Sequence, residues 1–145
     1  MNLNKKILVA FDGTKEGFSG LLEFAKTLPQ LDLDIHLLAV ARISAEEAIA
    51  ETYSANAFGE VNERYGSIVE EGKKQLTERG YRVTTHLALG DPIEQIVALA
   101  SDLRAELIVV GHRLRSSFAS RWWDRSVTAS LLEQSPCSIL IAVCD

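Results

Sequence analysis

The sequence predicts an α/β protein with an open, doubly wound sheet of five parallel strands and helices on both faces. Short apolar segments alternate with helical patterns along the chain, and right-handed crossovers convert that order into a parallel sheet. The run Leu107–Val110 (LIVV) contains no polar residue, as expected of a parallel strand that is covered on both faces. A chain of 145 residues without repeats or low-complexity linkers fits one domain, residues 1–145.

The first two predicted strands are Lys6–Phe11 and Leu33–Val40, with one helix between them. Thr14 is placed to cap this helix, and Pro29 ends it because proline lacks the N–H that a helix interior needs. Its predicted core face is a stripe of apolar residues at helical spacing: Phe18, Leu21, Leu22, Ala25 and Leu28.

The connection from Ser44 to Arg79 is long for a single crossover. Its first part, up to Gly59, is acidic and weakly periodic, and we interpret it as a mobile loop or a short helix. The second part carries a helical stripe that ends before Gly80, a typical helix-ending glycine. The next segment, Tyr81–Leu89, alternates in character, which indicates a less buried strand at an edge of the sheet.

Asp91, Pro92 and Glu94 predict the start of the helix before the fourth strand, as cap, first helical residue and closing residue of a capping box. Gly111 directly follows the fourth strand, and we expect the chain to turn there. An amphipathic helix then leads to the final strand, Ser138–Val143.

The best place for a site is the carboxyl end of the strands, where the strand order of an open parallel sheet reverses. If the first and fourth strands are neighbours, Asp12 and Gly111 converge on one crevice. The segment after Gly111, HRLRSSFAS, is rich in arginine and serine and suits an anion. Asp12 has an equally good alternative role, because it can cap the helix that starts near Thr14.

Composition excludes several other classes of function. The formal charge of −5 argues against a nucleic-acid-binding protein, and no apolar run is long enough to span a membrane. Asp12 interrupts the first apolar segment too early for a signal peptide, so we expect a cytoplasmic protein. Cys137 and Cys144 flank one strand at a separation that excludes a disulfide between them, and we expect reduced thiols.

No combination of residues predicts catalysis or metal binding. The sequence has no nucleophile elbow, no His/Glu pair at metal-ligand spacing and no complete phosphate loop, so we expect no enzyme. His36 and His86 fall within two predicted strands, at positions that can be adjacent in the sheet. They make a poor metal site without a cysteine or carboxylate partner. His112 can contact an anion when protonated, although a solvated loop residue is the simpler interpretation.

Several segments resemble the universal stress protein (UspA) family: ILVAFDGT, HLLAV, GDPIEQIVALA and the end of the chain from VVGHR to SVTASLLEQSPCSILIAV. The resemblance covers essentially the whole chain, although the segment Ser44–Arg79 carries no family signature. It implies the strand order 3-2-1-4-5 and a small cytoplasmic stress-response protein that forms dimers.

Many members of this family bind ATP through a loop patterned as Gly, two residues, Gly, nine residues, Gly, then Ser or Thr. The matching positions here are Gly111, Leu114, then Asp124 or (with one inserted residue) Arg125, and finally Ser126 and Val127. The resemblance also makes Asp12 the acidic residue that contacts the nucleoside and Val40 the residue whose backbone meets the adenine.

The loop therefore lacks two of the glycines that let backbone N–H groups approach phosphate oxygens. Leu114 adds a side chain in that space, and Asp124 repels phosphate. Arg113, with two further arginines of the loop, offers charge as a different means of holding an anion. The chain looks closer to the UspA branch, which is not expected to bind ATP. The alternative is an ATP-binding or AMP-binding switch of the same fold.

The resemblance and the final strand together predict a homodimer that acts through contacts with other proteins. The final strand is apolar and nearly free of charge, and the family's strand order places it at a sheet edge that invites pairing with another chain. The predicted interface consists of Ser138, Ile139, Leu140, Ile141, Ala142 and Val143.

Overall fold

The computed structural model describes residues 5–11, 22, 33–41, 55–113 and 125–144. The strands are β1 (Lys5–Phe11), β2 (Leu33–Ala41), β3 (Arg82–Leu89), β4 (Leu107–Arg113) and β5 (Ser138–Cys144). The helices within the described ranges are α3 (Ala55–Glu78), α4 (Pro92–Leu103) and α5 (Arg125–Gln134). The predicted helix between the first two strands lies outside the described residues, apart from Leu22.

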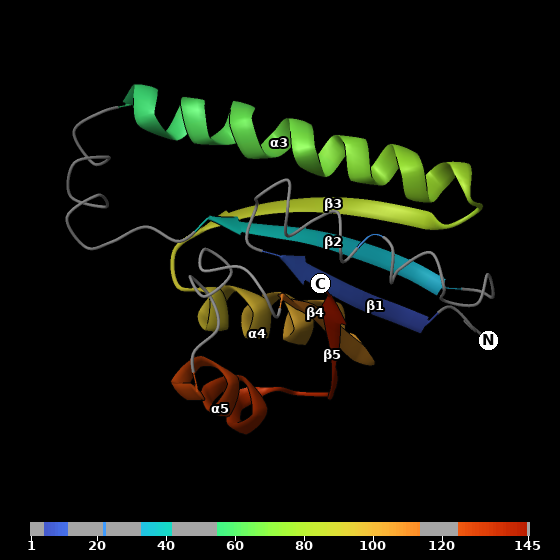
Figure 1. Cartoon of the computed structure of the whole chain (residues 1–145), viewed down its shortest axis with the longest axis vertical. Helices are drawn as coiled ribbons and strands as arrows, with labels where there is room; N and C mark the ends of the chain where they lie inside the picture. The colour runs from blue at the N-terminus through green and yellow to red at the C-terminus, as the bar shows by residue number, and fades with distance from the viewer. Residues whose placement is uncertain (1–4, 12–21, 23–32, 42–54, 114–124, 145) are drawn as a thin grey trace.

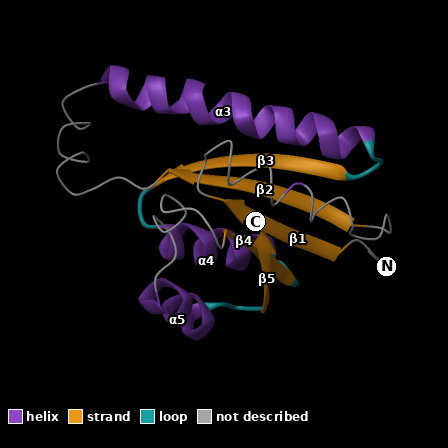
Figure 2. Ribbon diagram, viewed as in Figure 1, coloured by secondary structure: helices purple, strands orange, loops and turns teal. Residues whose placement is uncertain are grey.

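The five strands form one parallel sheet in the order β3-β2-β1-β4-β5. Helix α3 lies over one face of this sheet, and α4 and α5 lie on the other side (Figure 1 and Figure 2). The chain moves outward from β1 to β3 and then crosses back to β4 and β5, so right-handed crossovers place the two sets of helices on opposite faces. The predicted doubly wound α/β class and strand order are confirmed.

The side chains of β1 alternate between two buried layers. Ile7, Val9 and Phe11 belong to the layer that α3 covers, whereas Leu8 and Ala10 belong to the layer that α4 and α5 cover. A central parallel strand with helices on both faces buries both sets of side chains, which explains the uninterrupted apolar sequence of β1. The helices contribute Val69 and Leu76 to the first layer, and Ile96, Ala100 and Leu131 to the second.

Two element boundaries differ from the sequence prediction by more than one residue. Strand β4 continues through Gly111 to Arg113, because its last three residues pair with the end of β5. The prediction of a turn at Gly111 was therefore wrong, since the ladder with β5 keeps the backbone extended past this glycine. Helix α3 begins at Ala55 and so includes the end of the segment that was interpreted as a mobile loop or short helix.

The two outer strands of the sheet are β3 and β5. No residue of β3 is fully buried, which agrees with the prediction that this strand lies at an edge of the sheet and is less buried. The final strand also lies at an edge, as the family resemblance implied. The sheet therefore offers two different edges, one at each end of the strand order.

Candidate functional site

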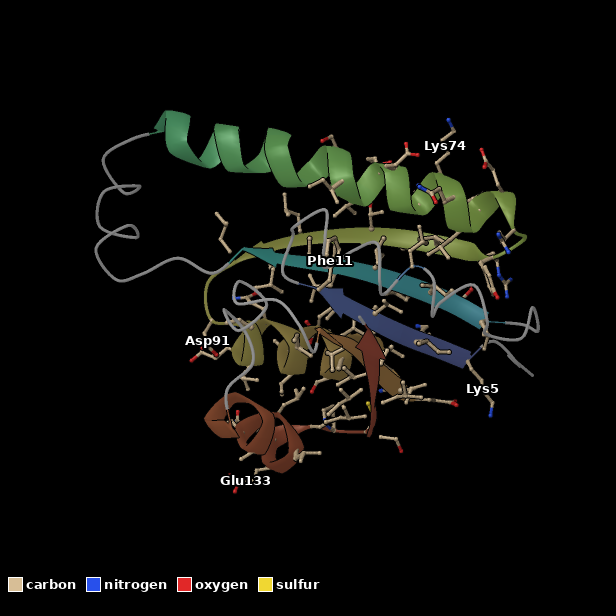
Figure 3. The ribbon with its side chains drawn as sticks, viewed as in Figure 1. Lys5, Phe11, Lys74, Asp91 and Glu133 are labelled. Carbon is tan, nitrogen blue, oxygen red and sulfur yellow. The ribbon has the colours of Figure 1, made fainter. Side chains whose placement is uncertain are left out.

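The strand order reverses between β1 and β4, which is where a doubly wound sheet binds its ligands. The backbone ladder between these two strands ends at Ala10 and Val110. Beyond that point β1 still pairs with β2 at Phe11, and β4 still pairs with β5 as far as Arg113. Phe11 marks this carboxyl end of β1 in Figure 3, with Lys5 at the opposite end. The candidate nucleotide site lies at this carboxyl end of the central strands.

Val40 lies in β2 near the candidate site, and its side chain is fully buried in the layer beneath α4. Its neighbour Ala39 forms the last pair with β1, while Val40 itself pairs with Ala88 of β3. The buried side chain leaves the backbone as the part of Val40 that can meet a ligand. This is the role that the family resemblance implies for Val40.

The other predicted nucleotide residues lie at the ends of three elements. Gly111 is half-buried within β4 and pairs with Ala142, and Arg113 is the last residue of β4. Ser126 and Val127 lie in the first turn of α5, where backbone N–H groups and the helix dipole favour an anion. Asp12, Leu114 and Asp124 lie outside the described residues.

The backbone places these positions at the same end of the sheet, where the strands finish. Strands β2, β1 and β4 are consecutive and parallel, so the segments around Val40, Phe11 and Gly111 all lie toward the carboxyl ends. The structure confirms the strand order on which the predicted site depends, and the site itself stays a prediction. The contacts that Asp12 or Arg113 would make with a ligand remain a prediction.

A second polar feature, the pair His36 and His86, connects β2 with β3. Nδ1 of His36 and Nε2 of His86 lie 2.9 Å apart, so one ring donates a hydrogen bond to the other. His36 pairs with Thr84 in the ladder and His86 with Leu38, so the rings approach diagonally on one face of the sheet. The sequence allowed adjacent positions for the two histidines but did not determine the contact, because a single-residue change of register would place the rings on opposite faces.

Burial lowers the pKa of both histidines below their ordinary value. For His36, the neighbouring His86 and Lys6 lower the pKa further, while Asp34 acts in the opposite direction. Desolvation disfavours the charged form of an imidazole, so both rings are neutral near pH 7. No group of three or more metal-ligating side chains occurs among the described residues.

Two ion pairs among the described residues lie at the amino ends of the strands, away from the candidate nucleotide site. Nε of Arg82 lies 3.1 Å from Oδ1 of Asp34, and Nζ of Lys5 lies 3.8 Å from Oε2 of Glu106. Both ion pairs are substantially exposed, so each contributes little to stability.

Strand β5 carries the residues that were predicted to form a dimer interface. Ile141 is 39% exposed and Ser138 is exposed, whereas Ile139 and Leu140 are half-buried and Ala142 is buried. The side chain of Val143 lies outside the described part of the strand. An apolar strand at the edge of a sheet is the kind of surface to which another chain can add a strand. In the described residues, no helix is long and apolar enough to cross a membrane.

The fold and the reversal of strand order define a Rossmann-like α/β protein with a candidate ligand site between β1 and β4. The model of the universal stress protein family matches residues 3–142 of the chain. This chain therefore belongs to the universal stress protein family.

Two curated relatives carry the same family name. The universal stress protein MJ0531 of Methanocaldococcus jannaschii is 23% identical over 141 residues, which cover 97% of this chain and 82% of the relative. The universal stress protein YxiE of Bacillus subtilis is 27% identical over 148 residues, which cover 94% of this chain and 97% of the relative.

Solved structures share the fold at similarly low sequence identity. The structure of the hypothetical protein MJ0577 is 24% identical with a TM-score of 0.78, covering 97% of this chain and 96% of that one. A universal stress protein in complex with cAMP is 19% identical with a TM-score of 0.62, covering 97% and 98%. A universal stress protein from Archaeoglobus fulgidus in complex with dAMP is 17% identical with a TM-score of 0.62, covering 97% and 98%.

Proposed function

We propose that this universal stress protein is a cytoplasmic stress-response protein without enzymatic activity that forms a homodimer and acts through contacts with other proteins. The observation that carries the dimer is the position and character of β5. This strand is the last of the sheet, its sequence SILIAVC contains no charged residue, and Ile141 is exposed on it. A second copy placed antiparallel about a two-fold axis would extend the ladder and cover Ile141.

Sedimentation of the unmodified protein at micromolar concentration tests the dimer. We expect a dimer, and we expect replacement of Leu140 and Ala142 by proline to shift it toward monomer, because proline lacks a ladder donor. A clean monomer for the unmodified protein contradicts the proposal. A proline variant that stays dimeric moves the interface away from β5.

We also propose that the protein binds ATP weakly or not at all. Leu114 and Asp124 stand where the ATP-binding pattern has glycine, and a side chain there obstructs the approach of phosphate oxygens to backbone N–H groups. The position of Gly111 inside the ladder with β5, rather than in an open turn, also supports weak binding. Equilibrium dialysis with labelled ATP tests this, and a low-micromolar dissociation constant would contradict it.

A second candidate function is a switch that binds AMP or a related adenine nucleotide. Two structures with this fold hold cAMP and dAMP, ligands that carry one phosphate rather than three. A ligand of that size would use the nucleoside side of the proposed site, at Asp12 and Val40, and little of the altered phosphate loop. The first turn of α5 at Ser126 is then available for the single phosphate.

A thermal-shift comparison of ATP, ADP and AMP separates the two candidates, because a ligand that prefers the folded state raises the midpoint of unfolding. If the protein is a dimer that binds no nucleotide, the midpoint of unfolding should not shift with any of the three nucleotides. The switch predicts a shift with AMP. Asp12→Ala should abolish this shift, whereas His36→Ala, which changes a residue of β2 away from the proposed site, should retain it. A shift that survives Asp12→Ala would place the site away from the end of β1.

A further inference from the structure

The two imidazoles of His36 and His86 meet end to end rather than face to face. Their ring centroids are 5.2 Å apart and their facing nitrogens 2.9 Å apart. The centroids are thus farther apart than the nitrogens by about twice the radius of an imidazole ring. Both nitrogens therefore lie close to the line between the ring centres, which is the arrangement of a straight N–H···N hydrogen bond.

This geometry suits a shared proton and not a metal ion. A metal takes the lone pairs of two imidazoles from converging directions, with each nitrogen about 2 Å from the ion. Here the two nitrogens point at one another at 2.9 Å, which leaves room for a hydrogen atom between them. Within the described residues the pair also has no third ligand that would complete a metal site.

The protonation state of the pair decides whether this contact holds. When both rings are neutral, one N–H donates to the other ring's bare nitrogen. When one ring gains a proton, the bond survives, because an imidazolium still donates to a neutral imidazole. When both rings are protonated, two N–H groups face each other at 2.9 Å without an acceptor, and two positive charges repel.

The charged neighbours of the pair come from all three strands on this side of the sheet. Lys6 of β1 lowers the pKa of His36, and Asp34 of β2 raises it to a smaller extent. Asp34 is also paired with Arg82 of β3, so it does not act on the histidine alone. Helix α4 packs on this face through apolar side chains, and its acidic residues Glu94 and Asp102 are exposed.

We propose that His36 and His86 form an acid-sensitive contact that ties the edge strand β3 to β2 and breaks when both rings become protonated. Strand β3 is a good candidate for local release because it is an outer strand, paired with β2 on one side, and is at most half-buried. Among the described residues, two further polar side-chain contacts hold β3: Arg82 to Asp34 at 3.1 Å, which is partly exposed, and Thr85 to Glu70 of α3 at 3.2 Å, which is exposed.

The direction of the pH effect follows from the lowered pKa of both histidines. A group whose pKa is lower in the folded state than in the unfolded chain contributes stability that is present above the unfolded value of 6.5. This contribution is lost as the pH falls from 6.5 through the lower pKa of the folded state. The contact therefore holds at neutral pH and weakens in mild acid.

Hydrogen exchange of the backbone amides of β3, measured on the full chain at about pH 7 and pH 5 and corrected for intrinsic rates, tests this proposal. One proton taken up on opening changes the opening equilibrium by at most tenfold per pH unit. We expect protection of β3 to fall by about tenfold or more between the two pH values, with little change in the central strand β1. Equal protection of β3 at both pH values overturns the proposal.

Three variants separate the histidine pair from other titrating groups. His86→Gln retains a hydrogen-bonding partner that does not titrate near pH 6, so we expect it to remove most of the pH dependence. If His86→Gln fails to fold, His36→Gln serves the same purpose. His112→Gln, which changes the third histidine of the chain, should behave as the unmodified protein.

Asp34→Asn tests the neighbouring ion pair, because asparagine can accept a hydrogen bond from Arg82 without a titrating carboxylate. We expect the fall in protection of β3 to persist in this variant. Loss of the pH effect in Asp34→Asn, with its persistence in His86→Gln, would overturn the proposal and assign acid sensitivity to the ion pair.

Discussion

Gly80 and Arg104 hold the same position in two helix-ending motifs, and both have a left-handed backbone, with φ of 96° and 56°. After Gly80, the N–H of Tyr81 donates to the carbonyl of Leu76 at 3.2 Å. After Arg104, the N–H of Ala105 donates to the carbonyl of Ala100 at 2.9 Å. Both are the bond that closes a Schellman motif, so α3 and α4 end in the same way. Only one of the two ends carries the glycine that this conformation favours.

Replacing Arg104 by glycine should therefore stabilise the protein. A left-handed residue with a Cβ costs about 1–2 kcal/mol, and the greater freedom of glycine in the unfolded chain offsets part of the gain. We expect Arg104→Gly to raise the free energy of unfolding by about 0.5–1 kcal/mol, measured by urea denaturation. Arg104→Ala retains the Cβ and should not stabilise. Equal stabilisation by both variants would assign the effect to the arginine side chain instead.

The amino end of α4 depends on a different contact. Oδ2 of Asp91 accepts a hydrogen bond from the backbone N–H of Glu94 at 3.0 Å, and Pro92 occupies the first helical position. Asp91→Ala leaves that N–H without its cap and should lower the free energy of unfolding by about 1 kcal/mol. Asp91→Asn keeps an oxygen acceptor and should lose much less in the same urea titration. A similar loss in both variants would mean that the negative charge, rather than the cap, stabilises the helix.

Gly66 is a weak point within α3. A Cβ added to this residue meets no atom within 4 Å, so alanine fits without a clash. Alanine favours a helix interior over glycine by about 1 kcal/mol, and we expect Gly66→Ala to raise the free energy of unfolding by about 0.5–1 kcal/mol. Gly80→Ala is the matched control, because its φ of 96° disfavours a Cβ and the same substitution should destabilise there. The two midpoints of thermal unfolding should move in opposite directions.

Cys137 should react slowly with thiol reagents. Burial raises the pKa of its thiol, and the smaller effect of the Ser135 side chain acts in the opposite direction. A raised pKa reduces the fraction of reactive thiolate at pH 8. We expect iodoacetamide to modify Cys137 several-fold more slowly in the folded protein than in the urea-unfolded chain, as measured by peptide mass spectrometry. Equal rates would show that the thiol is freely accessible.

The central strands of this fold could be predicted from the sequence because their residues are apolar on both faces. The runs ending at Phe11 and Val110 have few other places to lie in a folded chain, and both belong to the central strands β1 and β4. Local signals at chain reversals were also sufficient at Gly80 and Asp91, where capping depends on neighbouring residues alone.

Features that depend on partners distant in the sequence were missed or left open. The extension of β4 past Gly111 depends on its pairing with Ala142 and the residues that follow, and no residue near Gly111 signals this pairing. The contact between His36 and His86 depends on the register of β2 and β3, which the two histidines do not themselves determine. The reversal of strand order between β1 and β4 could be predicted from the sequence pattern, whereas a nucleotide site at that point stays a prediction.

The dimer proposed through β5 makes a specific prediction for Ile141. This side chain is 39% exposed on the outermost strand, so a lysine can replace it without burying a charge in the monomer. In a dimer that pairs β5 with its copy, two-fold symmetry places the new charges of both subunits in one interface, where they repel and lose water. We expect Ile141→Lys to weaken association at least tenfold in sedimentation equilibrium while the circular dichroism spectrum stays unchanged.

The opposite edge of the sheet supplies the control for that experiment. Thr84 is exposed on β3, so Thr84→Lys adds the same charge to an outer strand at the far end of the strand order. If β5 forms the interface, Thr84→Lys should associate as the unmodified protein does. Weakened association in Thr84→Lys with no effect in Ile141→Lys would place the interface on β3. Weakening in both would point to a general effect of charge, because two edges at opposite ends of one sheet cannot both lie in a single two-fold contact through β5.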